Sequence, residues 1–367
     1  MTLVEKASLK MLVLDLDGTI LNDHKEIIPE NLKAIQELKK KNPNIIICIV
    51  TGRPFLPSIF YARKIGADVL ATNDGGAIYL KDDDKNYKLE KAFYMTEKKC
   101  SAIFNKIREY SVENPDLFWL FTTDKIKYNV IIGNGEDSLK KAYNIFCPDE
   151  KTVRHEGVLQ VENFDDLKKL DGLSKHIIKI YTYFGKEDIG KKQYHEFNEF
   201  LEKEKGKINC VSTPPFLNAI APWGIDKGNA VRLIIEKFEE MGIRIKRSEV
   251  AIVGNDYNDL AMLKLEGCRS YGPSNAREEI KGLENVHILK QSNNEPWIKE
   301  LIENFKSRET IGINREQKQL NIFSQPEILG VDKWLAKAKA NPTIPKNFTP
   351  QPSRNPSLNR SPLDIIR

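Results

Sequence analysis

Short apolar runs alternate with amphipathic stretches along most of the chain. Residues 11–14, 45–50 and 250–253 are almost wholly aliphatic, as expected of strands that are buried on both faces of a parallel sheet. Between the first two, residues 29–41 begin with proline and repeat apolar positions on one stripe, which predicts a helix. This alternation of strand and helix predicts an α/β fold with a doubly wound parallel sheet.

The same pattern predicts the other elements of this sheet and its covering helices. Further helices are predicted at residues 54–65, 227–241, 256–264 and 295–305, and further strands at residues 68–71, 77–80, 269–271 and 286–289.

The pattern changes between residues 82 and 211. There, lysine-rich helices predicted at residues 96–112, 138–146 and 187–204 alternate with short strands predicted at residues 117–121, 127–131, 176–184 and 207–211. Because the first type of strand resumes afterwards, we interpret residues 82–211 as an α/β cap domain. It is inserted into a core that is formed by residues 1–81 and 212–305.

The end of the chain, residues 306–367, has a different composition. It carries 11 Lys/Arg against 5 Asp/Glu, whereas the rest of the chain is nearly neutral with 46 against 47. Between Asn341 and Pro362 lie Pro342, Pro345, Pro350, Pro352, Pro356 and Pro362. Such a segment buries little surface, so we expect a disordered basic tail. Residues 331–340 resemble a weak helix and are a candidate for docking a partner.

Composition excludes several classes of protein. No apolar run is long enough to span a membrane, and the first residues lack the core of a signal peptide. The five cysteines are scattered, which fits a reducing cytoplasm and argues against disulfides or a zinc site. The near-neutral body lacks the basic face of a nucleic-acid-binding protein.

Two carboxylates at the end of the first strand carry the strongest chemical signal. Asp15 and Asp17 follow the apolar run and are themselves followed by Gly18 and Thr19. Like charges this close cost energy unless a cation lies between them. Mg²⁺ would remove that cost. Asp15 suits a nucleophile that attacks phosphorus, and Asp17 suits a general acid and base.

Two later segments could hold a phosphoryl group. Thr51 and Gly52 lie between the second strand and a helix, where a hydroxyl and backbone N–H groups can bind a phosphoryl oxygen. Alternatively, Thr51 caps that helix. Lys227 stands at the start of a helix, although a helix dipole favours anions there. A phosphoryl group beside Lys227 would explain its place, whereas the alternative is an ordinary surface lysine.

The last segment adds acidic groups at the end of another strand. Gly254 is followed by Asn255, Asp256, Tyr257, Asn258 and Asp259. Oxygen ligands of this kind would complete a Mg²⁺ site with Asp15 and the backbone carbonyl of Asp17. Either Asn255 or Asp256 supplies the next ligand, and Asp256 could instead cap the following helix. All four segments end predicted parallel strands or lie beside them, where open α/β sheets bind ligands.

In this order, the four segments resemble the motifs of the haloacid dehalogenase superfamily of phosphatases and phosphotransferases. The long insertion between Thr51 and Lys227 is similar to that of the Cof-like subfamily, which has a type IIB cap. The resemblance implies a Rossmann-like core, Mg²⁺ as cofactor and a small phosphorylated metabolite, such as a sugar phosphate, as substrate.

The resemblance also assigns roles to residues of this chain. It implies that Asp15 is the nucleophile, that Asp17 is the acid and base, and that Thr51 and Lys227 bind phosphate. It aligns Asp259 with the last aspartate of the metal motif, where Asn255 replaces the usual first aspartate. Further site candidates are Arg53, Asp74, Asn258 and Asn275. Asp74 stands where many members of the subfamily have asparagine.

We therefore expect a Mg²⁺-dependent phosphatase that forms an aspartyl-phosphate. Two alternatives stay open. One is a phosphotransferase or phosphomutase on the same scaffold, and the other is a non-catalytic docking protein that uses its basic tail.

Overall fold

The computed structural model describes residues 8–114, 116–124, 129–133, 158–160, 169, 172–204, 206–213 and 216–307. The chain divides into two compact units, residues 1–318 and residues 319–367. The description below concerns the first unit. The helix predicted at residues 138–146 and the predictions for the tail beyond Ser307 lie outside the described residues.

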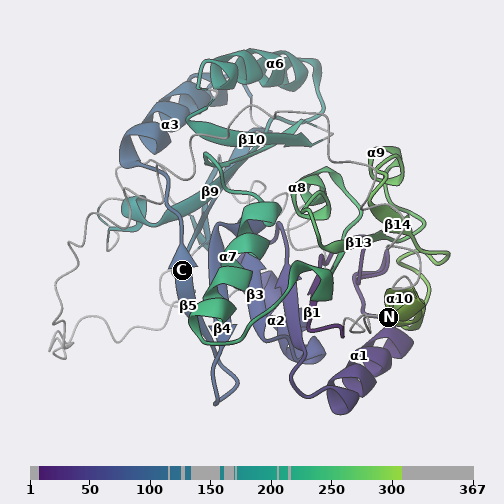
Figure 1. Cartoon of the computed structure of the whole chain (residues 1–367). Helices are drawn as coiled ribbons and strands as arrows, with labels where there is room; N and C mark the ends of the chain where they lie inside the picture. The colour runs from purple at the N-terminus through teal and green to yellow at the C-terminus, as the bar shows by residue number, and fades with distance from the viewer. Residues whose placement is uncertain are drawn as a thin grey trace, which may run out of the picture. The chain divides into compact units, whose positions relative to one another are not determined.

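The larger sheet has eight strands in the order β14-β13-β12-β1-β2-β3-β4-β5 (Figure 1). The strands are β1 (Met11–Leu14), β2 (Ile46–Val50), β3 (Val69–Thr72), β4 (Ala77–Lys81), β5 (Tyr87–Ala92), β12 (Val250–Val253), β13 (Arg269–Gly272) and β14 (Val286–Ile288). The strands from β14 to β3 are parallel, and β4 and β5 add an antiparallel edge. β1 lies between β12 and β2, with Leu14 opposite Val253 and Ile49.

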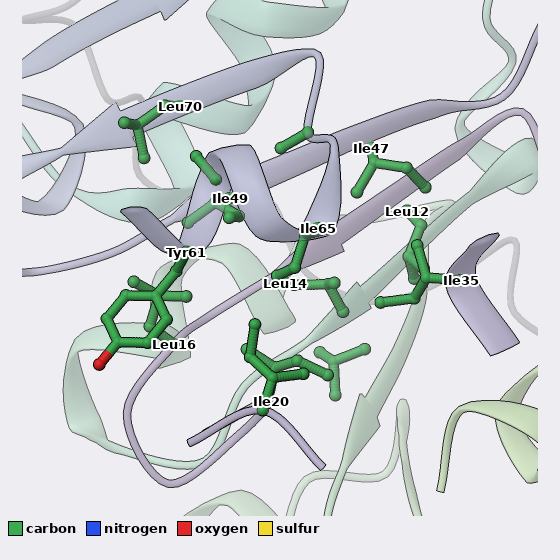
Figure 2. Close-up of a cluster of buried hydrophobic side chains, with 14 of the residues drawn as sticks. Leu12, Leu14, Leu16, Ile20, Ile35, Ile47, Ile49, Tyr61, Ile65 and Leu70 are labelled. Atoms are coloured by element: carbon green, nitrogen blue, oxygen red, sulfur yellow. The ribbon is translucent and has the colours of Figure 1, made fainter. Parts of the chain in front are cut away.

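Helices cover both faces of this sheet. They are α1 (Pro29–Lys41), α2 (Phe55–Ile65), α7 (Lys227–Glu240), α8 (Leu260–Leu263), α9 (Glu278–Lys281) and α10 (Ile298–Ser307). Since successive strand residues point to opposite faces, Leu12 and Leu14 pack with α1, α2 and α10. Figure 2 shows part of this cluster, including Ile35 of α1 and Ile65 of α2. Met11 packs in the opposite core with α7, α8 and α9.

The central strands are apolar along their whole length because both of their faces are buried. Every residue of β1, β2, β3 and β12 is buried. The prediction of a parallel α/β sheet with helices on both sides is therefore confirmed.

A second sheet has six strands in the order β10-β11-β9-β6-β7-β8. The strands are β6 (Phe118–Thr123), β7 (Asn129–Gly133), β8 (Val158–Gln160), β9 (Ile177–Tyr183), β10 (Ile208–Thr213) and β11 (Leu217–Pro222). Its helices are α3 (Glu97–Ser111) and α6 (Asp188–Glu202). Both helices share a separate apolar cluster with this sheet, built around Trp119, Phe121 and Ile180.

Most predicted elements occur within a few residues of their expected bounds. β5, β8, β11 and α9 were not predicted: β5 is a mostly exposed edge strand, β8 and α9 span only three and four residues, and β11 contains asparagine and ends in proline. The helix expected at residues 256–264 is instead a 3₁₀ turn (Tyr257–Asp259) followed by α8. The turn forms because the Asp259 carboxylate accepts the backbone N–H groups of Asn255 and Asp256.

The limits of the inserted domain stay a prediction, and strand pairing suggests how to refine them. β5 pairs with β4 in the first sheet, although it falls within residues 82–211. β11 pairs with β9 and β10 in the second sheet, although it follows residue 211. We propose that the inserted domain runs from about residue 93 to residue 222, because hydrogen bonding changes sheet there.

No helix in the described part of the chain combines the length and apolar character needed to cross a membrane.

Candidate active site

The sheet brings distant segments to one edge. Asp15 directly follows β1, Thr51 follows β2 and Asn255 lies two residues after β12. These three strands are neighbours and parallel, so their carboxyl ends lie side by side. Lys227, the first residue of α7, reaches the same place.

Asp15 lies at the centre of this group and is only 4% exposed. Its Oδ1 accepts a hydrogen bond from Lys227 Nζ at 2.6 Å, and its Oδ2 lies 3.1 Å from the Thr19 hydroxyl. Burial and the nearby charge of Asp259 raise the pKa of Asp15 to about 7, although Lys227 opposes this rise. The two carboxylate oxygens therefore face two different sets of partners.

Lys227 is completely buried, so it is not an ordinary surface lysine. Its Nζ lies 2.6 Å from Oδ1 of Asp15 and 2.6 Å from Oδ1 of Asp259. Burial alone would lower the pKa of Lys227, but the two carboxylates outweigh it and hold the pKa above its ordinary value. Helix α7 begins normally despite this lysine, because the Asp226 side chain accepts the N–H of Asn229 at 2.7 Å.

Asp259 is also fully buried, and both of its oxygens have partners. Oδ1 pairs with Lys227, while Oδ2 accepts the backbone N–H groups of Asn255 at 2.7 Å and Asp256 at 2.9 Å. This geometry fits a residue that positions Lys227 and the turn after β12. Both carboxylate oxygens are therefore already bonded in this structure.

Asn255 and Asp256 separate clearly in space. The Oδ1 atom of Asn255 lies 2.9 Å from the Thr19 hydroxyl, on the Oδ2 side of Asp15. Asp256 instead accepts from Tyr257 N–H and pairs with Arg277 near the surface, where its side chain is 41% exposed. The structure thus brings Asn255, but not the Asp256 side chain, to the group around Asp15.

The turn after Asp17 is shaped to fit Asn255. Gly18 has a φ of +70°, and a Cβ atom there would lie 2.4 Å from Nδ2 of Asn255. Any other residue would therefore be strained and would push the Asn255 carboxamide away. Asn275 supports the same turn by donating to the Gly18 carbonyl at 2.9 Å.

Asp17 is held by two cations. Arg53 donates through Nε and Nη2, both at 2.6 Å, and Lys25 Nζ lies 2.9 Å away. Burial would raise the pKa of Asp17, but the bonds and charge of Arg53, together with Lys25, lower it to about 2. In this arrangement Asp17 is ionised at neutral pH.

The loop after β2 has the groups expected of a phosphoryl site. Thr51 is buried, and its hydroxyl accepts the backbone N–H of Arg53 at 3.2 Å. It does not cap α2, whose N-cap is Pro54 without a side-chain bond. A Cβ atom on Gly52 would lie 3.1 Å from Oδ1 of Asp74, so the backbone and that carboxylate are close together.

Asp74 joins the loop after β2 to the turn after β12. It adopts the left-handed conformation with a φ of +56°, and its N–H donates to the Thr51 carbonyl at 2.9 Å. Its Oδ1 accepts from Nδ2 of Asn258 at 2.9 Å, and its Oδ2 pairs with Lys179 of β9. Asp74 and Asn258 thus lie beside the predicted phosphoryl site.

Three residues of this site were not identified from the sequence. Thr19 was noted only as part of a motif, Lys25 lies in a polar turn, and Lys179 falls in a strand of the second sheet. Only the burial of Thr19 and Lys179 and their contacts with distant residues reveal them.

The comparison with known families identifies the chain. Residues 12–302 match the family model of haloacid dehalogenase-like hydrolases. The chain belongs to this family. It is therefore an enzyme of the haloacid dehalogenase-like hydrolases, as the motifs indicated.

Several members of this haloacid dehalogenase-like family are similar over most of the chain. A Metamycoplasma hominis protein provisionally named a phosphatase is 25% identical over 78% of this chain and 92% of its own. A Bacillus subtilis protein, the 5-amino-6-(5-phospho-D-ribitylamino)uracil phosphatase YwtE, is 24% identical over 82% of this chain and 99% of its own.

The fold is also that of solved haloacid dehalogenase-like hydrolases. The structure of one from Bacteroides thetaiotaomicron has a TM-score of 0.62 with 21% sequence identity. The match covers 80% of this chain and 98% of the other. At this identity the likeness establishes the fold.

Two of the predicted metal ligands, Asp15 and Asn255, lie together beside Thr19 and suit a hard cation. Oδ2 of Asp15 and Oδ1 of Asn255 are oxygen donors that face the same hydroxyl, as Mg²⁺ prefers. Asp256 and Asp259 have other partners. Among the described residues, no cluster of three or more His, Cys, Asp or Glu side chains could hold a metal.

Proposed function

We propose that the protein is a phosphatase that hydrolyses a small phosphomonoester with Mg²⁺ as cofactor, through a phosphoryl group carried on Asp15. The observation that carries the proposal is the buried Asp15 carboxylate. It lies at the tip of the central strand with Lys227 against one oxygen and the Thr19 and Asn255 side chains near the other.

The charges of the site support a dianionic substrate that binds together with a divalent cation. Four carboxylates lie in this region (Asp15, Asp17, Asp74 and Asp259), and four cations pair with them (Lys25, Arg53, Lys179 and Lys227). With all four carboxylates ionised the charges balance, and Mg²⁺ together with a phosphomonoester dianion would keep this balance.

In the first step, a carboxylate oxygen of Asp15 attacks phosphorus and the ester P–O bond breaks. The leaving oxygen takes a proton from Asp17. Lys227, the Thr51 hydroxyl and the Gly52 N–H stabilise the phosphoryl oxygens as negative charge develops. Asp15 Oδ2, the Asp17 carbonyl and the Asn255 carboxamide would hold Mg²⁺, which supplies Lewis-acid stabilisation of the phosphoryl group when bound.

In the second step, water attacks the phosphorus of the Asp15 acyl phosphate and loses a proton to Asp17. The P–O bond to Asp15 breaks, and inorganic phosphate leaves with the carboxylate restored. Both steps require Asp17 to exchange protons, so it must first move away from Arg53 and Lys25, which hold it ionised. Arg53 is then available for an anionic substrate.

The substrate class rests on the chemistry of the site together with the relatives. One relative is named as the phosphatase of a phosphorylated ribityl compound, which is a small phosphomonoester. We therefore propose a small phosphorylated metabolite, such as a sugar phosphate, as the substrate of this chain.

A panel of phosphorylated metabolites tests the proposal through release of inorganic phosphate, with Mg²⁺ and after exhaustive chelation. Wild-type protein should release phosphate without an added acceptor and should lose activity on chelation. Asp15→Asn should abolish turnover and the transient gain of a phosphoryl group in intact mass. Asp188→Asn, at an exposed aspartate of α6, serves as the matched control.

Substantial turnover by Asp15→Asn would exclude Asp15 as the nucleophile. Phosphate transfer only when an acceptor is present would favour a phosphotransferase or phosphomutase instead.

A further inference from the structure

Lys179 is a buried lysine to which the proposed mechanism gives no role. It lies in the middle of β9 in the second sheet and is only 3% exposed. Its neighbours in the strand, Ile178 and Ile180, are apolar and fully buried. Burying an ammonium group is costly unless a partner compensates its charge, so this position needs a specific reason.

The partner comes from the other sheet. Lys179 Nζ forms an ion pair with Oδ2 of Asp74, and the two side chains are 4% and 13% exposed. Burial by itself lowers the pKa of Lys179, but the charge of Asp74 outweighs burial and raises the pKa to about 12. Both groups therefore stay charged, and neither has bulk water to replace its partner.

A hydrogen bond beside the ion pair joins the same two segments. Tyr181 lies two residues after Lys179, so the two side chains point to the same face of β9. The Tyr181 hydroxyl donates to the Gly52 carbonyl at 2.7 Å, and Lys179 Nζ lies 4.8 Å from the centre of the Tyr181 ring. One face of β9 thus contacts both the loop after β2 and the turn after β3.

Asp74 connects these contacts with the phosphoryl site. Its backbone N–H is bound by the Thr51 carbonyl, and its Oδ1 is bound by Asn258. An asparagine at position 74 could accept the same bond from Asn258 without adding a charge. A buried aspartate at this position needs a cation to compensate its charge, and Lys179 is that cation.

We infer that Lys179 is a positioning residue that acts through Asp74. The ion pair between them, called here the inter-sheet ion pair, fixes Gly52 and Asn258 in the arrangement that receives a phosphoryl group. The site is then complete only while β9 contacts the first sheet. This inference rests on the proposed function and adds that the second sheet supplies a residue on which that site depends.

The test is a double-mutant cycle of Lys179→Met, Asp74→Asn and the double variant. Each single variant leaves one buried charge without its partner, whereas the double variant removes both charges and keeps an Asn that suits the left-handed turn. We expect each single change to lower kcat on p-nitrophenyl phosphate by about 10- to 100-fold with a smaller change in KM, because the loop is misplaced. The double variant should recover most of that loss.

The control is Lys237→Met, which removes a half-exposed ion pair with Glu90 that takes no part in these contacts, and it should leave kcat unchanged. Thermal melts identify any variant that fails to fold, and Lys179→Arg then takes the place of Lys179→Met. Arginine should retain most of the activity, since it keeps the charge.

Hydrogen exchange at the amides of Asn73 and Asp74 gives a readout that does not require turnover. Both N–H groups donate into the loop after β2, to Arg53 and Thr51. They should exchange faster in Lys179→Met than in wild-type protein, and wild-type rates should return in the double variant. If wild-type protein shows no phosphatase activity, the proposed function fails and exchange alone decides this inference.

Two results would overturn the inference. One is unchanged kcat together with unchanged exchange in Lys179→Met. The other is a double variant whose loss of kcat equals the product of the two single losses, because independent sites behave in that way.

Discussion

Replacement of Asp259 by alanine should lower the free energy of unfolding strongly, although the residue lies in a short turn. The side chain is fully buried and accepts three bonds, from Lys227 Nζ and from the N–H groups of Asn255 and Asp256. Alanine removes all three acceptors at once. It leaves Asp15 as the carboxylate that is hydrogen-bonded to Lys227 and leaves the N–H groups of Asn255 and Asp256 without this acceptor.

The size of the effect follows from these contacts. Breaking a buried ion pair by removing one partner typically costs about 3–5 kcal/mol. Each unsatisfied backbone donor adds up to about 1–3 kcal/mol, but Asp15 and entering water offset part of that sum. We expect a loss of about 4 kcal/mol in the free energy of unfolding, which corresponds to a melting temperature lower by roughly 8–16 °C.

Urea denaturation followed by circular dichroism measures this loss. Asp256→Ala is the matched control, because Asp256 lies in the same turn but pairs with Arg277 near the surface. It should cost about 1 kcal/mol, mainly through its bond to the N–H of Tyr257. Equal losses in the two variants would show that Asp259 does not hold the turn and Lys227 together.

Three further predictions address metal binding, acid stability and the tail. Asp15 has a pKa of about 7 without metal, and only its ionised form binds Mg²⁺ well. The affinity of the protein for Mg²⁺, measured by calorimetry, should therefore rise as the pH increases from about 5.5 to about 8, and a flat profile would contradict this. Asp17 has a folded pKa of about 2, below its ordinary value of 3.8, so it stabilises the fold above pH 3.8 and this contribution is lost as the pH falls towards 2. Arg53→Gln should therefore raise the midpoint of acid unfolding and remove about 1 kcal/mol at neutral pH, discounted because the Asp17 side chain is 40% exposed. A chain that ends at Ser307 should keep its melting temperature and its turnover. Loss of either would show that the tail contributes to the catalytic domain.

The fold and the place of the site could be predicted because both depend on local patterns. A strand that is buried on both faces must be apolar along its whole length, and β1, β2 and β12 have this character. Polar residues directly after such strands then have to lie together at one edge of the sheet. Asp15, Thr51 and Asn255 were found in this way.

The precise partners could not be predicted, because they depend on side-chain directions and on distant segments. Thr19 contacts Asn255 across 236 positions of sequence, and Lys179 contacts Asp74 across 105. Asp256 and Asp259 are three residues apart in one motif, yet one lies near the surface and the other is fully buried. The 3₁₀ turn between them decides this difference, and the periodicity of the sequence had suggested a regular helix instead.

The central place of β1 has a consequence for biosynthesis. Its neighbour β12 is made more than 230 residues later, after every strand of the second sheet has been synthesised. During translation β1 can pair with β2 early, but one of its edges has no partner until β12 leaves the ribosome. Asp15 likewise has no contact with Lys227 until that residue is made, 212 positions further along the chain. Shorter nascent chains therefore lack the contact between Lys227 and Asp15, and they expose an unpaired apolar strand edge that favours aggregation until β12 has been made.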